Sequence, residues 1–265
     1  NRTSPFAFTG NKFEFRMLGS SNSIACANIM LNAAVAESLK IYADRLEGAE
    51  DFETTLHDMI RKTIKDHKHI IFNGNGYDES WIQEATEERG LLNYRTTADC
   101  MPHLLDKKNA DMLKDHRIFT DAELQSRCEI MLENYCKTIS IEAHTMLDMA
   151  KGEIIPAIET YMKELAEIAA AKKSLSEDIS VKYETSQVSV LSTLVDEIAQ
   201  AADVLQAAVD SLGECGDIVE EAQIMRDSIL VKMDELRRPA DQAEVLTARK
   251  YWPFPTYGDL LFGVK

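Results

Sequence analysis

The stretch that decides how this chain is read is its beginning, NRTSPFAFTGNKFEFRM, residues Asn1–Met17. From Lys12 onward charged and apolar residues alternate strictly, which is typical of a β-strand because successive side chains of a strand point to opposite faces. The charged residues fall on one face: Lys12, Glu14 and Arg16. The apolar residues fall on the other: Phe13, Phe15 and Met17. We therefore predict a short strand whose apolar face packs and whose other face carries charges of alternating sign.

This row of charges has two interpretations. It fits the solvent-exposed face of an antiparallel sheet, where opposite charges on neighbouring strands pair weakly. It also fits a carboxylate that holds a divalent cation between two cations that hold phosphate oxygens. Mg²⁺ keeps one or two protein carboxylates and completes its shell with substrate phosphates and water. Phosphoryl transfer also needs fixed positive charge around the migrating group.

The longer string NRTSPFAFTGNKFEFRMLGSSNSIA resembles the late active-site segment of glutamine synthetases, above all the type III enzymes of bacteria. Further strings resemble that family in the same order: HKHIIFNGNGY from His67, FTDAELQSRCEIMLENYCKTISIEA from Phe119, the MLDMAKGEIIPA region, and KYWPFPTYGDLLF at Lys250–Phe262. The resemblance spans nearly the whole chain and is weakest between about Lys172 and Arg238.

The resemblance implies a role for each charged residue of the opening segment. Glu14 matches the glutamate that binds the metal ion, Mg²⁺ or Mn²⁺, bridging the nucleotide phosphates. Arg16 matches the arginine beside the transferred phosphoryl group, and Arg2 matches the one that stabilises the phosphate in flight. Lys12 stands where many relatives carry an arginine toward the ATP phosphates, and a lysine there makes a looser contact. The run SPFAFTG lacks a further arginine that many relatives carry.

The resemblance also implies the activity, the ligation of glutamate and ammonium by ATP through a γ-glutamyl phosphate intermediate. It implies a ring-type homo-oligomer as well. Because Asn1 lies inside a motif, we expect a substantial upstream part that supplies the other metal-binding glutamates, the nucleotide pocket and most of the glutamate site. The chain alone is then expected to lack most of the active site.

Composition restricts the partners. The 265 residues carry a formal net charge of −16, which argues against nucleic-acid backbones and anionic membranes. The sequence contains no run of 18 or more apolar residues, so it predicts no membrane-spanning helix. Five cysteines without CxxC spacing favour reduced thiols in a cytoplasmic protein. Cys128 and Cys136 share a helix face and are interpreted as small apolar fillers.

Beyond Arg16 the pattern predicts mostly helix. We expect a helix capped by Ser23 over Ile24–Leu46, which its many apolar residues predict to be deeply buried, and an amphipathic helix over Phe52–Lys65. A strand over His69–Phe72 should precede a turn at Asn73–Gly76, and a helix from Glu79 should end at Gly90. The Gly-rich turn lacks the Lys-Ser/Thr of a phosphate-binding P-loop. Thr96–Pro102 is expected to be loose.

The second half predicts long helices. Thr120 and Glu123 form a capping box that opens the longest helix, with a kink expected at Pro156. Its acidic residues favour a solvated face over a metal cluster. Ser176–Leu236 is typical of a helical hairpin, in which apolar residues recur at three- and four-residue steps: Leu191, Leu194, Ile198, Ala201, Leu205, Ala208 and Leu212. The aromatic and proline-rich segment from Tyr251 is expected to form an extended strap.

The fold class predicted is therefore α+β, mostly α: a short N-terminal strand segment, the end of a glutamine-synthetase-type catalytic sheet, followed by helices with a long hairpin. The predicted divisions are residues 1–118, the end of the catalytic domain; residues 119–250, a helical bundle; and residues 251–265, the strap. Two alternatives to glutamine synthesis stay open at this point. One is a helical assembly module without its own catalysis, and the other is a ligase that joins glutamate to another amine.

Overall fold

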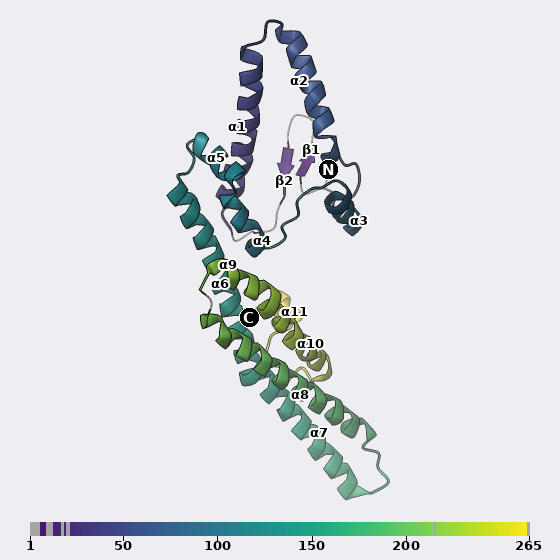
Figure 1. Cartoon of the computed structure of the whole chain (residues 1–265). Coiled ribbons are helices and arrows are strands. Elements are labelled where there is room, and N and C mark those ends of the chain that lie inside the picture. The colour runs from purple at the N-terminus through teal and green to yellow at the C-terminus, as the bar shows by residue number, and fades with distance from the viewer. Residues whose placement is uncertain (1–5, 9–12, 17–18, 20–21, 215, 264–265) are drawn as a thin grey trace. The chain divides into compact units, whose positions relative to one another are not determined.

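Helices dominate the computed structural model of the chain, which describes residues 6–8, 13–16, 19, 22–214 and 216–263 (Figure 1). The prediction of a mostly helical chain is confirmed. The chain divides into two compact units. Unit 1 comprises Asn1–Arg95 and His103–Gln125, and unit 2 comprises Thr96–Pro102 and Ser126–Lys265. Each unit has its own core and is described by itself.

Unit 1 begins with a β-ribbon of two short antiparallel strands, β1 (Phe6–Phe8) and β2 (Phe13–Phe15). Its helices are α1 (Ala25–Glu47), α2 (Phe52–Asp66), α3 (Glu79–Gln83) and α5 (Lys107–Asp115). A 3₁₀ turn at Lys68–Ile70 follows α2, and a π-helical turn at Glu84–Glu88 extends α3. That the β-ribbon is the end of a larger catalytic sheet stays a prediction.

Local signals place these helices. The side chain of Asp51 caps α2 by accepting a hydrogen bond from the Thr54 backbone N–H at 3.2 Å. The helix that starts at Glu79 stops at Gly90, whose φ of +66° lies in the left-handed region that glycine adopts at low cost. Both helix starts and both stops therefore lie within a residue or two of the positions predicted from the sequence.

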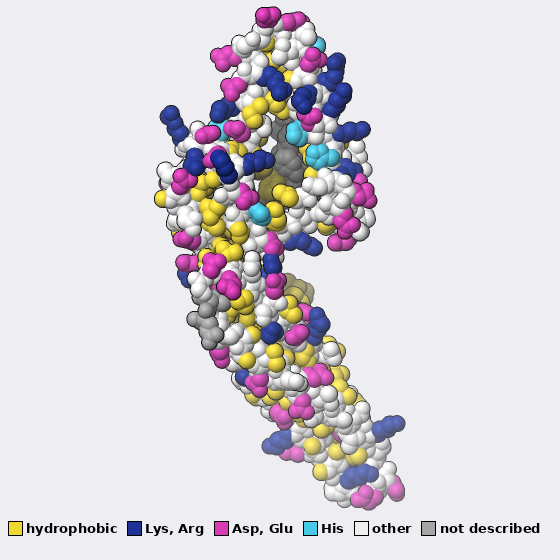
Figure 2. Space-filling model, in the orientation of Figure 1, with side chains coloured by type: hydrophobic (Ala, Val, Ile, Leu, Met, Phe, Trp, Pro, Cys, Tyr) yellow, Lys and Arg dark blue, Asp and Glu magenta, His cyan; other side chains and the backbone are white. Residues whose placement is uncertain are grey.

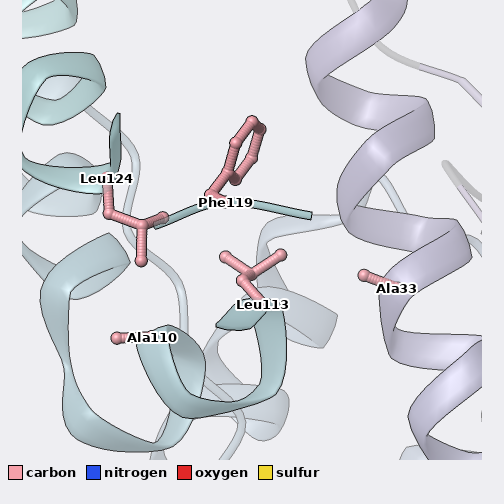
Figure 3. Packing of buried hydrophobic residues seen from close by; sticks show 5 residues of the cluster. All are labelled: Ala33, Ala110, Leu113, Phe119 and Leu124. Atoms are coloured by element: carbon pink, nitrogen blue, oxygen red, sulfur yellow. The ribbon is translucent and has the colours of Figure 1, made fainter. Parts of the chain in front are cut away.

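The core of unit 1 forms where α1, α5 and the start of α6 (Asp121–Met149) meet (Figure 3). Its buried members are Ala33, Ala110, Leu113, Phe119 and Leu124. Near this core, His116 at the end of α5 is 2.7 Å from Glu37 of α1, measured from imidazole Nε2 to carboxylate Oε2. The core is small, and it covers only one face of α1.

Unit 2 is built from helices of very different length. They are α4 (Thr97–Cys100), the continuation of α6, α7 (Ile155–Leu175), α8 (Lys182–Asp210), α9 (Ile218–Ile224), α10 (Leu230–Leu246) and α11 (Tyr257–Phe262). A π-helical turn at Ala150–Ile154 joins α6 to α7, and another at Met225–Ile229 joins α9 to α10. The predicted capping box at the start of α6 is present, since the Thr120 N–H donates to the Glu123 carboxylate at 2.8 Å.

Helix α8 is the centre of unit 2, because it contacts both α7 and α10 (Figure 1). The predicted apolar seam is its inner face, with Leu191, Ile198 and Leu205 fully buried. The prediction of a two-helix hairpin is therefore correct for α8 and the α9–α10 run, while α7 lies against α8 as a third helix. Cys128 and Cys136 are buried on α6, as predicted for small apolar fillers.

Four local predictions are wrong. Helix α1 is not deeply buried, because unit 1 covers one of its faces and Ala33 is its one fully covered residue. Residues 69–72 form no strand, since Lys68–Ile70 is a 3₁₀ turn. Thr96–Pro102 is not loose, because it contains α4, capped by Thr96. Part of the C-terminal segment is helical rather than extended, since Thr256 and Asp259 form a capping box for α11.

The sequence predicts a division of the chain into a catalytic end, a helical bundle and a strap, with boundaries at residues 118 and 250. This division stays a prediction. The boundary between the two units lies near the first of these positions, within α6. The second position falls inside unit 2.

Candidate functional site

The candidate site begins at the β-ribbon of unit 1, where the sequence places its chemistry. In the antiparallel register Phe6 pairs with Phe15, Ala7 with Glu14, and Phe8 with Phe13. Glu14 is therefore the central residue of β2, and the small Ala7 is opposite to it in the register. The ribbon has only three residues per strand, and isolated two-stranded ribbons are marginally stable in water.

The four predicted site residues are not equally well described. Glu14 is placed in β2 by its backbone, and Arg16 directly follows that strand. Arg16 is half-buried and has an interaction partner. Arg2 and Lys12 lie outside the described residues, as does Met17 of the predicted apolar face. Phe15 of that face is 47% exposed, so the expected close packing of this side chain is wrong for unit 1.

The described residues contribute little to a metal centre on their own. Among them, no three His, Cys, Asp or Glu side chains form a group that could hold a metal ion. The acidic residues of α6, Glu129, Glu133 and Glu142, are exposed, in agreement with the solvated face predicted for that helix. A single carboxylate is within the range that Mg²⁺ takes from a protein when phosphates and water supply its other ligands. That Glu14 is such a carboxylate stays a prediction.

Sequence reasoning missed a cluster of side chains around Arg89 in unit 1. Arg89 Nη1 donates to the backbone carbonyls of His69 at 3.0 Å and Ile71 at 2.9 Å. Its other nitrogens bind the Glu84 carboxylate at 2.8 and 2.5 Å. The guanidinium lies 4.7 Å from the centre of the Trp81 ring, which stacks on Phe72 at 3.8 Å. These contacts use the backbone carbonyls of His69 and Ile71, which pair with no strand among the described residues. The cluster thereby holds the segment before the Asn73–Gly76 turn.

A second cluster lies in unit 2. Arg226, in the π-helical turn, binds the Asp227 carboxylate through two nitrogens at 2.6 and 2.7 Å and donates a further hydrogen bond to Asp99 of α4. The hydrogen bonds and charge of Asp227 raise the pKa of Arg226, and Arg226 lowers the pKa of Asp227. Burial raises the pKa of the nearby Tyr135 phenol. These contacts hold α4 against α9 and the π-helical turn that follows it, so their role is structural.

A third cluster joins α7 to α8. Glu184 in the first turn of α8 is buried and accepts a hydrogen bond from Lys172 in the last turn of α7. Elsewhere on α7, the Glu164 carboxylate is contacted by Lys250 at 2.8 Å, and the Tyr161 ring lies 5.3 Å from that of Tyr251. The start of the C-terminal segment therefore packs on α7. None of these groups carries chemistry that the sequence reasoning assigned to the site.

Comparison with known proteins identifies what the chain is similar to. A family model described as "Glutamine synthetase C-terminal domain" matches residues 55–173. A glutamine synthetase from Butyrivibrio fibrisolvens is 36% identical over 270 residues, which cover 100% of this chain and 38% of that protein. The type-3 glutamine synthetase of Dictyostelium discoideum is 33% identical, and the match covers 99% of this chain and 36% of that protein. A glutamine synthetase from Bacteroides fragilis is also 33% identical and is covered to 37%.

The chain therefore spans little more than a third of the length of these relatives. The family model does not reach the opening segment, since its match starts at residue 55. The relatives do reach it, because their matches cover 99–100% of the chain. The segment that contains Glu14 and Arg16 is thus inside the region of similarity.

Proposed function

Because the chain belongs to the glutamine synthetase family and corresponds to a C-terminal part of it, we propose that it supplies one wall of the active site of a glutamate–ammonia ligase. In this reaction ATP phosphorylates the side-chain carboxylate of glutamate, and ammonia then displaces the phosphate to give glutamine. The observation that carries the proposal is the similarity over the whole chain, the opening segment included.

Each charged residue of the opening segment has a part in the proposed mechanism. Glu14 is one ligand of a divalent cation, Mg²⁺ or Mn²⁺, which when bound neutralises charge on the nucleotide phosphates. Arg16 presents a planar guanidinium to the transferred phosphoryl group and to the carboxylate that receives it. Arg2 stabilises the same phosphoryl group, and Lys12 contacts the ATP phosphates as a point charge. The β-ribbon is in this proposal the end of the catalytic sheet.

The remaining expectations follow from the family. We propose that the complete protein acts on glutamate, ATP and ammonium, assembles as a ring-type homo-oligomer and works in the cytoplasm. Among the residues that the structure describes, no helix combines the length and apolar character needed to cross a bilayer. Residues 1–118 are assigned to the catalytic end, 119–250 to the helical bundle and 251–265 to the strap.

The proposal is tested by Glu14→Ala in the full-length enzyme. Loss of one metal ligand should weaken the apparent affinity for Mg²⁺ by roughly 10–100-fold, the scale on which metal-site partners act, and should lower turnover. Glutamine formation at increasing Mg²⁺ measures both effects. The matched control is Glu50→Ala, because Glu50 is an exposed glutamate outside the helices. Wild-type turnover and Mg²⁺ dependence in Glu14→Ala would make Glu14 an ordinary surface charge.

A second pair of variants separates Arg16 from Lys12. Charge develops on the group in transfer, whereas the nucleotide phosphates carry similar charge before and during reaction. Arg16→Lys should therefore lower turnover by roughly 10²-fold, the scale of one lost oxyanion-type donor. Lys12→Ala should mainly raise the Michaelis constant for ATP. Steady-state kinetics decide between the two roles, and the opposite pattern would mean that the assignment of this strand is out of register.

Two alternative functions are also testable. One alternative is an assembly role for the helical unit 2 in addition to catalysis elsewhere, and the oligomeric state of the full-length enzyme tests it. A ligase for another amine would keep the phosphate-binding residues, and replacing ammonium by other amines in the assay distinguishes it.

A further inference from the structure

The segment Thr96–Pro102 belongs to a different unit from the residues on either side of it. Arg95 and His103 are part of unit 1, whereas Thr96–Pro102, which contains α4, is part of unit 2. The chain therefore leaves unit 1 for one short helix, returns to it, and leaves it again within α6. Ordering such a segment costs backbone entropy, so contacts in unit 2 must offset that cost.

Two hydrogen bonds and one buried side chain hold α4 in unit 2. The Asp99 carboxylate accepts a hydrogen bond from Arg226 in the π-helical turn after α9. The Cys128 thiol of α6 donates to the backbone carbonyl of Met101 at 3.4 Å. Ala98 is 2% exposed, so α4 also buries an apolar side. The segment is therefore packed into unit 2 and is not a surface loop.

The Asp99–Arg226 pair differs from the ion pairs of the molecular surface. Figure 2 shows charged side chains of both signs spread over the surface of both units. Exposed ion pairs contribute little to stability, because water and salt screen them. The pair of Asp234 with Arg238 in α10 is of that kind, with side chains 55% and 71% exposed. The side chains of Asp99 and Arg226 are only 35% and 27% exposed, so we expect this pair to contribute more.

The two ends of the segment are held together in unit 1. The Tyr94 ring stacks on the His103 ring, with the ring centroids 4.2 Å apart. The His103 Nδ1 atom lies 2.8 Å from the Asp106 carboxylate, and the Asn109 side chain donates to the His103 carbonyl at 2.7 Å. Asp106 directly precedes α5 and Asn109 lies within it. The point at which the chain returns to unit 1 is therefore fixed to α5.

Helix α5 in turn packs on α1. Leu113 of α5 is fully buried in the core cluster that contains Ala33 of α1. His116, at the end of α5, is 2.7 Å from Glu37 of α1. Starting from Arg226 in unit 2, contacts within each unit and the backbone of the chain thus lead through α4 and α5 to α1.

We propose that α4 couples the stability of the two units: docking of α4 in unit 2 stabilises α5 and α1, and the packing of α5 stabilises α4 in return. The effect is mutual because a coupling free energy acts equally in both directions. Release of Thr96–Pro102 from unit 2 turns a fixed connection into a flexible loop, and the stack of Tyr94 on His103 must then hold that loop closed against its entropy. The inference rests on these contacts and does not depend on the proposed function.

The test is hydrogen exchange of the full-length enzyme, followed by mass spectrometry. Asp99→Asn removes the negative charge and keeps the size of the side chain. The amides of α1 around Ala33 and of α5 around Leu113 should then exchange at least about threefold faster, because a hydrogen bond to a charged group contributes a factor of about ten or more to an equilibrium. The matched control is Asp234→Asn, whose partner Arg238 lies on the same helix. It should leave exchange in unit 1 unchanged.

A second variant tests the coupling from unit 1. Tyr94→Leu removes the stack on His103 at a residue that is 42% exposed, so the fold should remain. The amides of α4 and of Met225–Ile229 in unit 2 should then exchange about twofold faster or more, the scale of one aromatic pair. If exchange changes only in the unit that carries the substitution, for either variant, the inference is wrong. An equal effect of Asp234→Asn on unit 1 also overturns it. If Asp99→Asn unfolds the whole protein, Tyr94→Leu alone decides.

Discussion

At the scale of single residues, the buried carboxylate of Glu184 is an important electrostatic feature of unit 2. Only 5% of this residue is exposed, and its hydrogen bond from Lys172 lowers the pKa of the carboxyl. Both charges also suit their helices, since Glu184 lies in the first turn of α8 and Lys172 in the last turn of α7. A carboxyl with a lowered pKa stabilises the folded state when it is ionised, so its contribution depends on pH.

We predict that Glu184→Gln destabilises the chain at neutral pH and that this loss disappears in acid. The wild-type stabilisation is present above the ordinary carboxyl pKa of 4.5 and is lost as the pH falls below it through the lowered folded value. Melting temperatures measured between pH 7 and pH 3 should therefore converge at the acid end. Glu197→Gln is the control, because Glu197 is an exposed glutamate of the same helix. Parallel curves for wild type and Glu184→Gln would contradict the role of the charge.

Sequence reasoning could not find these residue pairs, because their partners are far apart in the chain. Asp99 and Arg226 are 127 positions apart, and Arg89 binds carbonyls 18 and 20 positions away. Spacing rules reach only one or two helical turns. The site residues Glu14 and Arg16 were found by their alternation and their resemblance to a family, and their roles stay predictions.

At the scale of elements, the turn after the Arg89 cluster depends on a glycine. A Cβ built on Gly74 would lie 2.5 Å from Cζ of Phe72, whose ring stacks on Trp81 at 3.8 Å and lies 6.0 Å from the Arg89 guanidinium. We predict that Gly74→Ala destabilises the chain by about 1–3 kcal/mol, the usual cost of overpacking. Chemical denaturation monitored by tryptophan fluorescence measures the change.

Gly152 provides a control of opposite sign. It lies in the π-helical turn between α6 and α7, and a Cβ there meets nothing within 4 Å. Gly152→Ala should therefore stabilise the chain by about 0.5–1 kcal/mol, because alanine loses less backbone entropy than glycine in a helix. If both variants shifted stability in the same direction, the contact between Gly74 and Phe72 would not be the cause.

Where the elements were predicted correctly, the signal was local. The Thr120–Glu123 capping box, the amphipathic pattern of α2 and the seam of α8 each depend on neighbours within a few residues. The helix α11 had such a signal in Thr256 and Asp259, which the aromatic and proline content of the segment obscured. The burial of α1 could not be predicted in this way, because burial depends on which other elements cover a helix.

At the scale of the whole molecule, the two units differ in how much of their apolar surface they bury. Unit 2 surrounds α8 with α7 and α10 and buries a continuous row of leucines and isoleucines. Unit 1 buries a small cluster around Leu113 and Phe119 and leaves Val35 and Leu39 of α1 exposed. Unit 1 also contains the opening segment with Glu14 and Arg16. The unit assigned to chemistry is therefore the one with the less complete core.

The last prediction concerns the chain as a whole and its activity. We expect the 265-residue chain alone to form no glutamine from glutamate, ATP, Mg²⁺ and ammonium, because the proposed reaction uses more than one cation and the site segment offers one carboxylate, Glu14. The measurement is phosphate release and glutamine formation by the purified chain, with the Butyrivibrio fibrisolvens glutamine synthetase as the positive control. If activity appears when the remaining part of the polypeptide is added, the missing metal ligands lie in that part. Phosphate release that depends on glutamate from the chain alone would contradict the prediction, since one carboxylate would then suffice or further ligands would lie within this chain.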